Sequence, residues 1–163
     1  MNPSNVVLRD RIAAGVAGGI VGGVIIALYN IAVALAGGAS LGKALGTFAG
    51  IAAVAMGPAA ASSPAAPAIG VVLHFCVAIG WALGYAYLTR SQPQLLSRPI
   101  VSGLGFGVVV MIAMDMMLVL ANAYKLRDVP QFFTALVGHC VFYGIPVALT
   151  VSRLLRRELA GTR

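Results

Sequence analysis

Charged residues are scarce in this sequence: Asp, Glu, Lys and Arg together make up 9% of its 163 residues. Soluble domains carry about 25%, because a hydrated surface needs polar groups. Hydrophobic residues make up 60% of the chain, which is more apolar surface than a protein of this length can hide in one aqueous core. The composition therefore excludes an ordinary soluble domain and indicates that lipid surrounds most of the chain.

Cysteine is almost absent, and common catalytic motifs are missing. Cys76 and Cys140 both lie inside apolar runs, which does not fit the disulfide framework of a small secreted domain. The sequence has no Ser-His-Asp or Cys-His arrangement in a plausible setting and no Gly-rich phosphate loop between a strand and a helix. We therefore expect no enzymatic activity.

Four apolar runs are long enough to cross a bilayer, which takes about 20 residues. Their approximate ranges are 12–36, 68–88, 100–123 and 132–149. Continuous runs of this length predict helices rather than barrel strands. The expected fold is an all-α, polytopic four-helix bundle that forms a single transmembrane domain.

Basic residues predict the orientation of this bundle. Four spans place eight arginines on one side (Arg9, Arg11, Arg90, Arg98, Arg153, Arg156, Arg157 and Arg163) and Lys43, Lys125 and Arg127 on the other. Because basic residues favour the cytoplasmic side, both termini are expected there. The same distribution explains the net charge of +7 without a nucleic-acid partner, since the basic residues flank apolar runs.

Residues 37–67 are expected to form an external loop. Within it, the segment from Ser40 to Met56 has apolar residues at helical spacing, which predicts an interfacial or re-entrant helix. The stretch from Pro58 to Pro67, rich in Ala, Ser and Pro, predicts an extended connector.

Glycines mark the expected helix contacts. Small residues let membrane helices approach closely, and the candidates are Gly15, Gly19, Gly23, Gly80, Gly84, Gly103 and Gly107. The first and third spans both open with arginine and a glycine pair spaced by four, and the second and fourth each carry one histidine. This pattern suggests a duplicated two-helix hairpin. The alternative is that one glycine face binds a second copy or a partner subunit.

A polar layer is expected within the outer half of the membrane. It comprises Tyr29, Asn30, His74, Asp115, His139 and Tyr143. Ionisable groups are costly in lipid, so they should face the bundle interior. One interpretation is purely structural: Asp115 accepts a hydrogen bond from a histidine, and Asn30 or Tyr143 completes the network.

Three functional interpretations remain open for this layer. The first is binding and transfer of protons or a small cation. The second is one b-type haem, with His74 and His139 as axial ligands. The third is a copper(I) site using soft atoms from Cys76, Cys140, Met111, Met114, Met116 and Met117, although neighbouring residues point to different helix faces.

Several short motifs resemble one family of small bacterial inner-membrane proteins. Gly138-His139-Cys140-Val141-Phe142, followed by the basic ending Arg153 to Leu159, is similar to the last span of the YagU-like proteins. Leu73-His74-Phe75, with Gly80 and Gly84-Tyr85, and the glycine-rich Ala14 to Gly23 also fit. The resemblance implies a bacterial cytoplasmic membrane and an association with acid tolerance.

The sequence thus predicts a membrane protein that handles protons or a small solute, or serves as a non-catalytic membrane subunit. The haem protein is the alternative. No cofactor is expected otherwise, and the bilayer is the main partner.

Overall fold

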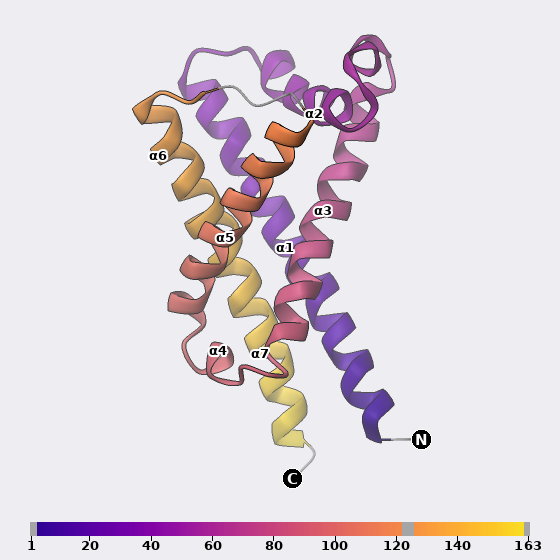
Figure 1. Cartoon of the computed structure of the whole chain (residues 1–163), viewed down its shortest axis with the longest axis vertical. Helices are drawn as coiled ribbons and strands as arrows, with labels where there is room; N and C mark the ends of the chain where they lie inside the picture. The colour runs from indigo at the N-terminus through magenta and orange to yellow at the C-terminus, as the bar shows by residue number, and fades with distance from the viewer. Residues whose placement is uncertain (1–2, 122–125, 162–163) are drawn as a thin grey trace.

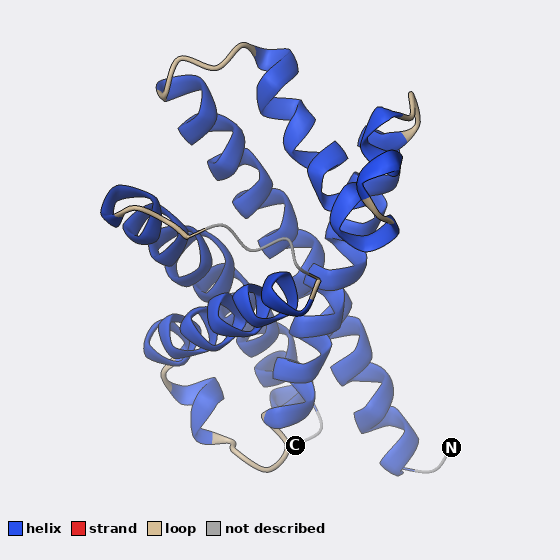
Figure 2. Ribbon diagram, turned by 45° about the horizontal axis from the view of Figure 1, so that its top comes forward, coloured by secondary structure: helices blue, strands red, loops and turns tan. Residues whose placement is uncertain are grey.

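The computed structural model describes residues 3–121 and 126–161, and within these ranges all regular structure is helical (Figure 2). The elements in chain order are α1 (Pro3–Ala36), α2 (Leu41–Met56), the 3₁₀ helix η1 (Pro58–Ser62), α3 (Ala66–Leu88), α4 (Gln94–Ser97), α5 (Pro99–Leu120), α6 (Val129–Val137), the π-helix η2 (Gly138–Gly144) and α7 (Ile145–Gly161). The last three follow one another without a break. The described chain therefore contains four long helical segments, as expected for an all-α bundle.

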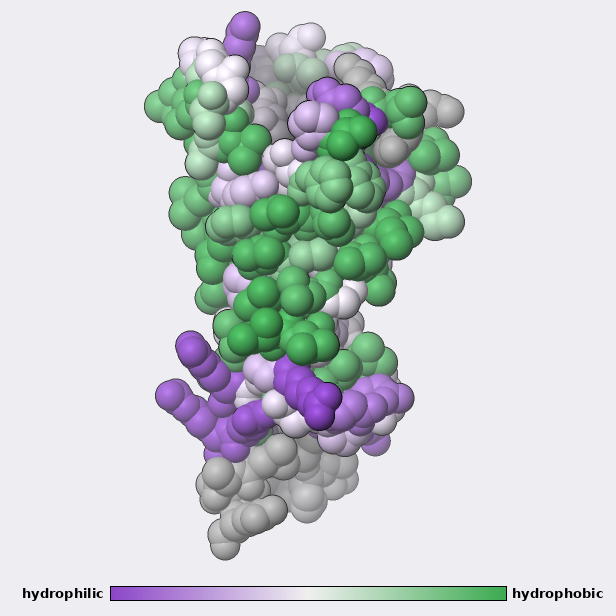
Figure 3. All heavy atoms as spheres, turned by 90° about the vertical axis from the view of Figure 1, so that its left-hand side faces the viewer, coloured by the Kyte–Doolittle hydropathy of each residue, from purple (hydrophilic) through white to green (hydrophobic). Residues whose placement is uncertain are grey.

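The four long segments have the length and composition of membrane spans. They cover Leu8–Ala36, Ala66–Leu88, Pro99–Leu120 and Val129–Arg157, with mean hydropathies between 1.8 and 2.2. In Figure 3 a broad apolar belt separates two ends where polar residues gather. Large hydrophobic side chains are exposed along these helices, which is the arrangement that lipid, and not water, stabilises. The chain is built as a multi-pass membrane protein.

Both termini lie at the same end of the bundle, and α2 lies across the opposite end (Figure 1). We call these the terminal end and the α2 end. An even number of spans requires this placement of the termini.

The first and last spans begin earlier than predicted, and α5 (Pro99–Leu120) ends at Leu120. Helix α1 begins at Pro3 instead of residue 12, and the last span begins at Val129 instead of residue 132. Asp128 and Gln131 form a capping box there, followed by a proline in the first turn. This start signal was readable in the sequence. The predicted end of the third span at residue 123 lies outside the described residues.

The region 37–67 agrees with the prediction in its first half and differs in its second. Helix α2 follows an N-cap at Ser40, and glycines in left-handed conformation, Gly38 and Gly57, flank it. The connector is not extended, because Pro58–Ser62 forms a 3₁₀ helix and α3 begins at Ala66. Proline fixes φ near the helical value, so an Ala-rich segment after Pro58 readily makes a short helix.

Glycines bring together the helices of each hairpin, α1 with α3 in the first and α5 with the last span in the second. A Cβ atom at Gly15 would lie 2.9 Å from the Cα of Leu83 in α3, and one at Gly103 would lie 2.7 Å from the Cα of Ile145 in α7. Gly19 and Gly107, one turn further along, are even closer to the backbones of α3 and η2. In both hairpins, therefore, glycines of the first helix pack against the backbone of the second, as expected for a duplicated unit.

Two of the predicted packing glycines do not pack. No atom of the described residues lies within 4 Å of a Cβ at Gly80 or Gly84. Helix α1 contacts the face of α3 that carries Ile79 and Leu83, and the next residue along a helix is turned by about 100° from that face. Gly80 and Gly84 are consequently directed away from α1.

Candidate functional site

A cavity of about 200 Å³ lies inside the bundle toward the α2 end. Its walls come from all four spans and from α2. They consist of Ile26, Asn30, Ile51, His74, Val77, Ala78, Trp81, Val110, Met114, His139 and Tyr143. Four residues of the predicted polar layer therefore meet here: Asn30, His74, His139 and Tyr143. An apolar wall with a few converging polar groups is typical of small-molecule sites.

His74 is anchored to the neighbouring helix α1. Its Nε2 lies 2.9 Å from the carbonyl oxygen of Gly23, and its ring makes edge contacts with Phe48 of α2 and Phe75. A carbonyl oxygen can only accept, so Nε2 carries the hydrogen. In the neutral ring, Nδ1 is then left with a lone pair.

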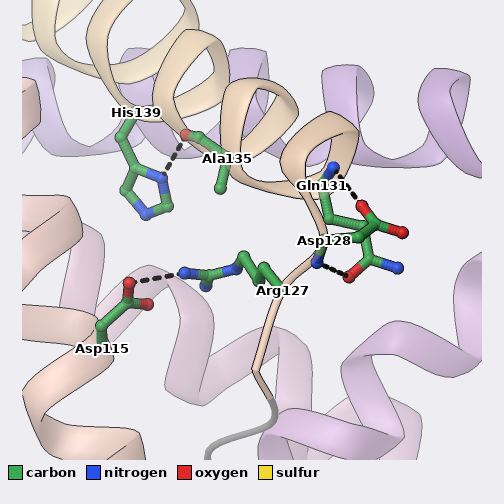
Figure 4. Close-up of polar contacts among 6 residues, drawn as sticks. All are labelled: Asp115, Arg127, Asp128, Gln131, Ala135 and His139. Atoms are coloured by element: carbon green, nitrogen blue, oxygen red, sulfur yellow. Dashed lines mark hydrogen bonds and ion pairs between the residues drawn. The ribbon is translucent and has the colours of Figure 1, made fainter.

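His139 is anchored within its own helix. Its Nδ1 lies 2.8 Å from the carbonyl oxygen of Ala135, one turn earlier (Figure 4). By the same argument Nδ1 donates, and Nε2 of the neutral ring keeps a lone pair. The residue stands in the π-helix η2, a rare element that occurs frequently at functional sites.

Two tyrosines of the predicted layer bond to backbone carbonyls. The Tyr143 hydroxyl donates to Ala78 of α3 at 2.6 Å. The Tyr29 hydroxyl donates to Thr134 of α6 at 3.0 Å, and its ring stacks on Phe142 with centroids 4.3 Å apart. Tyr29 does not line the cavity. These bonds tie α3 and α1 to the last span.

The partner of Asp115 differs from the one predicted for the polar network. Its carboxylate pairs with Arg127 at 2.5 Å (Figure 4), each side chain being 22% exposed. The expected hydrogen bond from a histidine is replaced by this ion pair, and Asp115 does not line the cavity. A guanidinium offers the carboxylate both charge and hydrogen bonds, so it displaces a neutral imidazole. The sequence pattern that could have predicted this ion pair is a single acidic residue near the end of a span, followed by an arginine in the next loop.

Two further hollows adjoin the central cavity. The outer groove, of about 320 Å³, lies at the α2 end and is lined by Asn30, Val33, Asp128, Pro130, Gln131, Thr134 and Ala135. The inner groove, of about 530 Å³, opens between α3 and α5 toward the terminal end and includes Trp81, Tyr85, Ser91, Ser102 and Phe106 in its lining. Asn30 is shared by the outer groove and the cavity, and Trp81 by the cavity and the inner groove. Each of the two grooves thus shares one lining residue with the central cavity.

The same geometry bears on cofactors. Both histidines line one cavity, as the haem prediction requires, but Nε2 of His74 is bonded to Gly23. The cavity, of about 200 Å³, is also below the range of about 300–1,000 Å³ usual for ligand clefts. Haem would therefore need His74 to turn and the helices to separate.

For metals, no group of three or more His, Cys, Asp or Glu side chains comes together in residues 3–121 and 126–161. The copper(I) interpretation gains no support from the geometry.

These features define a class: a multi-pass membrane protein whose spans line a small, partly open cavity with polar groups. A family model matches residues 9–160, and the chain belongs to that family, DUF6789, described as a family of unknown function. No curated protein and no solved structure matches the chain. The resemblance to YagU-like proteins is not tested by this match and stays a prediction.

Proposed function

We propose that the protein moves protons or a small polar solute across a bacterial cytoplasmic membrane through the series of three hollows. The observation that carries this proposal is that the hollows meet at Asn30 and Trp81. Together they run from Gln131 near the α2 end to Ser91 near the terminal end. A structural polar layer alone would need no such empty space.

Asn30 and Trp81 are the two constrictions of this route. Asn30 offers an amide to a passing solute between the outer groove and the cavity. Trp81 is the larger barrier, because its bulky ring lines both the cavity and the inner groove. With the termini in the cytoplasm, as the basic residues indicate, the outer groove would face the periplasm.

Flux measurements on the full chain in proteoliposomes test the proposal. A pH-sensitive dye inside the vesicles reports protons, and light scattering reports the swelling caused by small solutes. Trp81→Ala should raise the flux of the conducted species several-fold, whereas Asn30→Leu should lower it. Met116→Leu is the matched control, because Met116 is 64% exposed on α5 and lines none of the three hollows. If correctly folded protein conducts nothing above empty vesicles, the proposal is wrong.

The haem alternative keeps one supporting feature, since Nε2 of His139 is not engaged by Ala135. An optical spectrum of the purified protein decides it. A haem with two histidine ligands gives a strong Soret band, and a colourless preparation removes this alternative.

Association through a glycine face also stays a proposal, with a role as a membrane subunit as its consequence. Gly80 and Gly84 leave a face of α3 open, and such faces allow close helix contact in lipid. Sedimentation in detergent should show a smaller assembly for Gly80→Leu than for the unmodified chain if this face is used.

A further inference from the structure

The central cavity presents hydrogen-bond acceptors from two opposing hairpins. His74 of α3 and His139 of η2 each commit one ring N–H to a backbone carbonyl. Each neutral ring therefore keeps one unprotonated nitrogen, which can accept and cannot donate. The Tyr143 hydroxyl hydrogen is likewise committed, to Ala78. The N–H donors that remain among the described residues lining the cavity are the Asn30 amide and the Trp81 indole.

The geometry points to ammonium and small primary amines as the ligand class of this cavity. This inference rests on the proposed function and names its solute. A primary ammonium group carries several N–H donors on one atom, so it can satisfy two imidazole lone pairs at once. Among the described residues that line the cavity, an anion would find no cation, and its donors would be limited to the Asn30 amide and the Trp81 indole.

The apolar part of the wall suits the same class. Trp81 lines the cavity, and the face of an indole ring attracts cations better than that of Tyr or Phe. Val77, Val110 and Met114 offer contacts to a short alkyl group. The small volume of about 200 Å³ suits a small amine.

Charge along the entry route favours a cation. The outer groove is lined by the acidic residue Asp128, which accepts a hydrogen bond from the backbone N–H of Gln131 through one oxygen. Within residues 3–121 and 126–161, no Lys or Arg lines the outer groove or the central cavity. The nearest described arginine along the chain, Arg127, forms an ion pair with Asp115. A positive solute is thus drawn toward the cavity, and an anion is not.

Trp81 provides a direct readout, because it is the one tryptophan of the sequence. Its fluorescence is recorded while the purified full chain in detergent is titrated with methylammonium. A saturable change is expected. His74→Leu and His139→Leu should each weaken binding about tenfold, the usual loss when a charged ligand is deprived of one hydrogen bond. Met116→Leu should bind as the unmodified chain does.

Two further probes separate hydrogen bonding from charge and need no variant. Tetramethylammonium has the same charge and no N–H, so it should bind at least about tenfold more weakly. Acetate should not compete. Equal binding of tetramethylammonium, tighter binding of acetate, or no response to methylammonium would each overturn the assignment.

The outcomes also distinguish this inference from the proposed function. If protons or another solute are conducted and methylammonium neither binds nor permeates, the amine assignment fails while conduction stands. If methylammonium binds with the stated pattern and no solute is conducted, the ligand assignment stands and conduction fails.

Discussion

The two hairpins of this protein, α1 with α3 and α5 with the last span, are assembled alike but hold their histidines differently. In both, a glycine pair of the first helix lies against the backbone of the second: Gly15 and Gly19 in one, Gly103 and Gly107 in the other. In the first hairpin, however, His74 is bonded across the helix contact to Gly23. In the second, His139 is bonded within its own helix to Ala135.

The difference shows how two similarly packed hairpins can give a cavity with two unlike walls. The position of His74 depends on the packing of α1 against α3. The position of His139 depends on the local geometry of η2, and the second hairpin is further tied by the Asp115–Arg127 ion pair. Disturbing a hairpin contact should therefore affect the two sides of the cavity unequally.

The largest effect is expected at the glycine contacts. Gly19→Leu and Gly107→Leu place a side chain against the backbone of the facing helix, so both should lower the free energy of unfolding by about 3 kcal/mol or more. Thermal unfolding in detergent, followed by circular dichroism, measures this.

The control for these variants is Gly80→Leu, where the added side chain meets no described atom within 4 Å. Its stability should change by less than about 0.5 kcal/mol, as for most exposed positions. Equal losses at Gly19 and Gly80 would show that the glycines do not set the helix contact.

A smaller effect is expected from the Asp115–Arg127 ion pair, which lies in the second hairpin. Asp115→Asn or Arg127→Gln should cost about 2 kcal/mol, less than a fully buried pair because both side chains are 22% exposed. The double variant should recover part of that loss, since the two groups interact directly. Strict additivity in the double-mutant cycle would mean that the two groups do not interact.

The fold was largely predictable from the sequence, because span length, hydropathy and glycine spacing depend on local composition. The four spans, the helix near Ser40–Met56 and the glycine contacts of α1 and α5 illustrate this. Gly80 and Gly84 were not predictable in the same way, because spacing alone does not say which face of α3 meets α1.

The site was predictable only as a set of polar residues. The position of each residue along its predicted span placed Asn30, His74, His139 and Tyr143 at similar depth in the membrane. The structure places them around one cavity. Their hydrogen bonds were missed, because each partner is a backbone carbonyl of Gly23, Ala135 or Ala78. Every residue carries such a carbonyl, so no sequence pattern identifies the one that is used.

The smallest effect is expected from the histidines themselves. His74→Leu removes a bond between two helices and should cost about 1 kcal/mol, the net value of one hydrogen bond. His139→Leu removes a bond inside one helix and should change stability by less than about 0.5 kcal/mol. Equal losses in chemical unfolding would contradict the proposed difference between the two hairpins.

The most direct test of the account is whether water from the α2 side reaches the central cavity. In a Cys76→Ala and Cys140→Ala background, Met114→Cys places a thiol in the cavity wall, and Met116→Cys places one on the exposed face of the same helix. Thiols react as thiolates and so need water. We predict that a membrane-impermeant thiol reagent added from the α2 side modifies the Met114→Cys protein in proteoliposomes and leaves the Met116→Cys protein unmodified. Modification of the Met116→Cys protein alone, or of neither protein, would contradict the account.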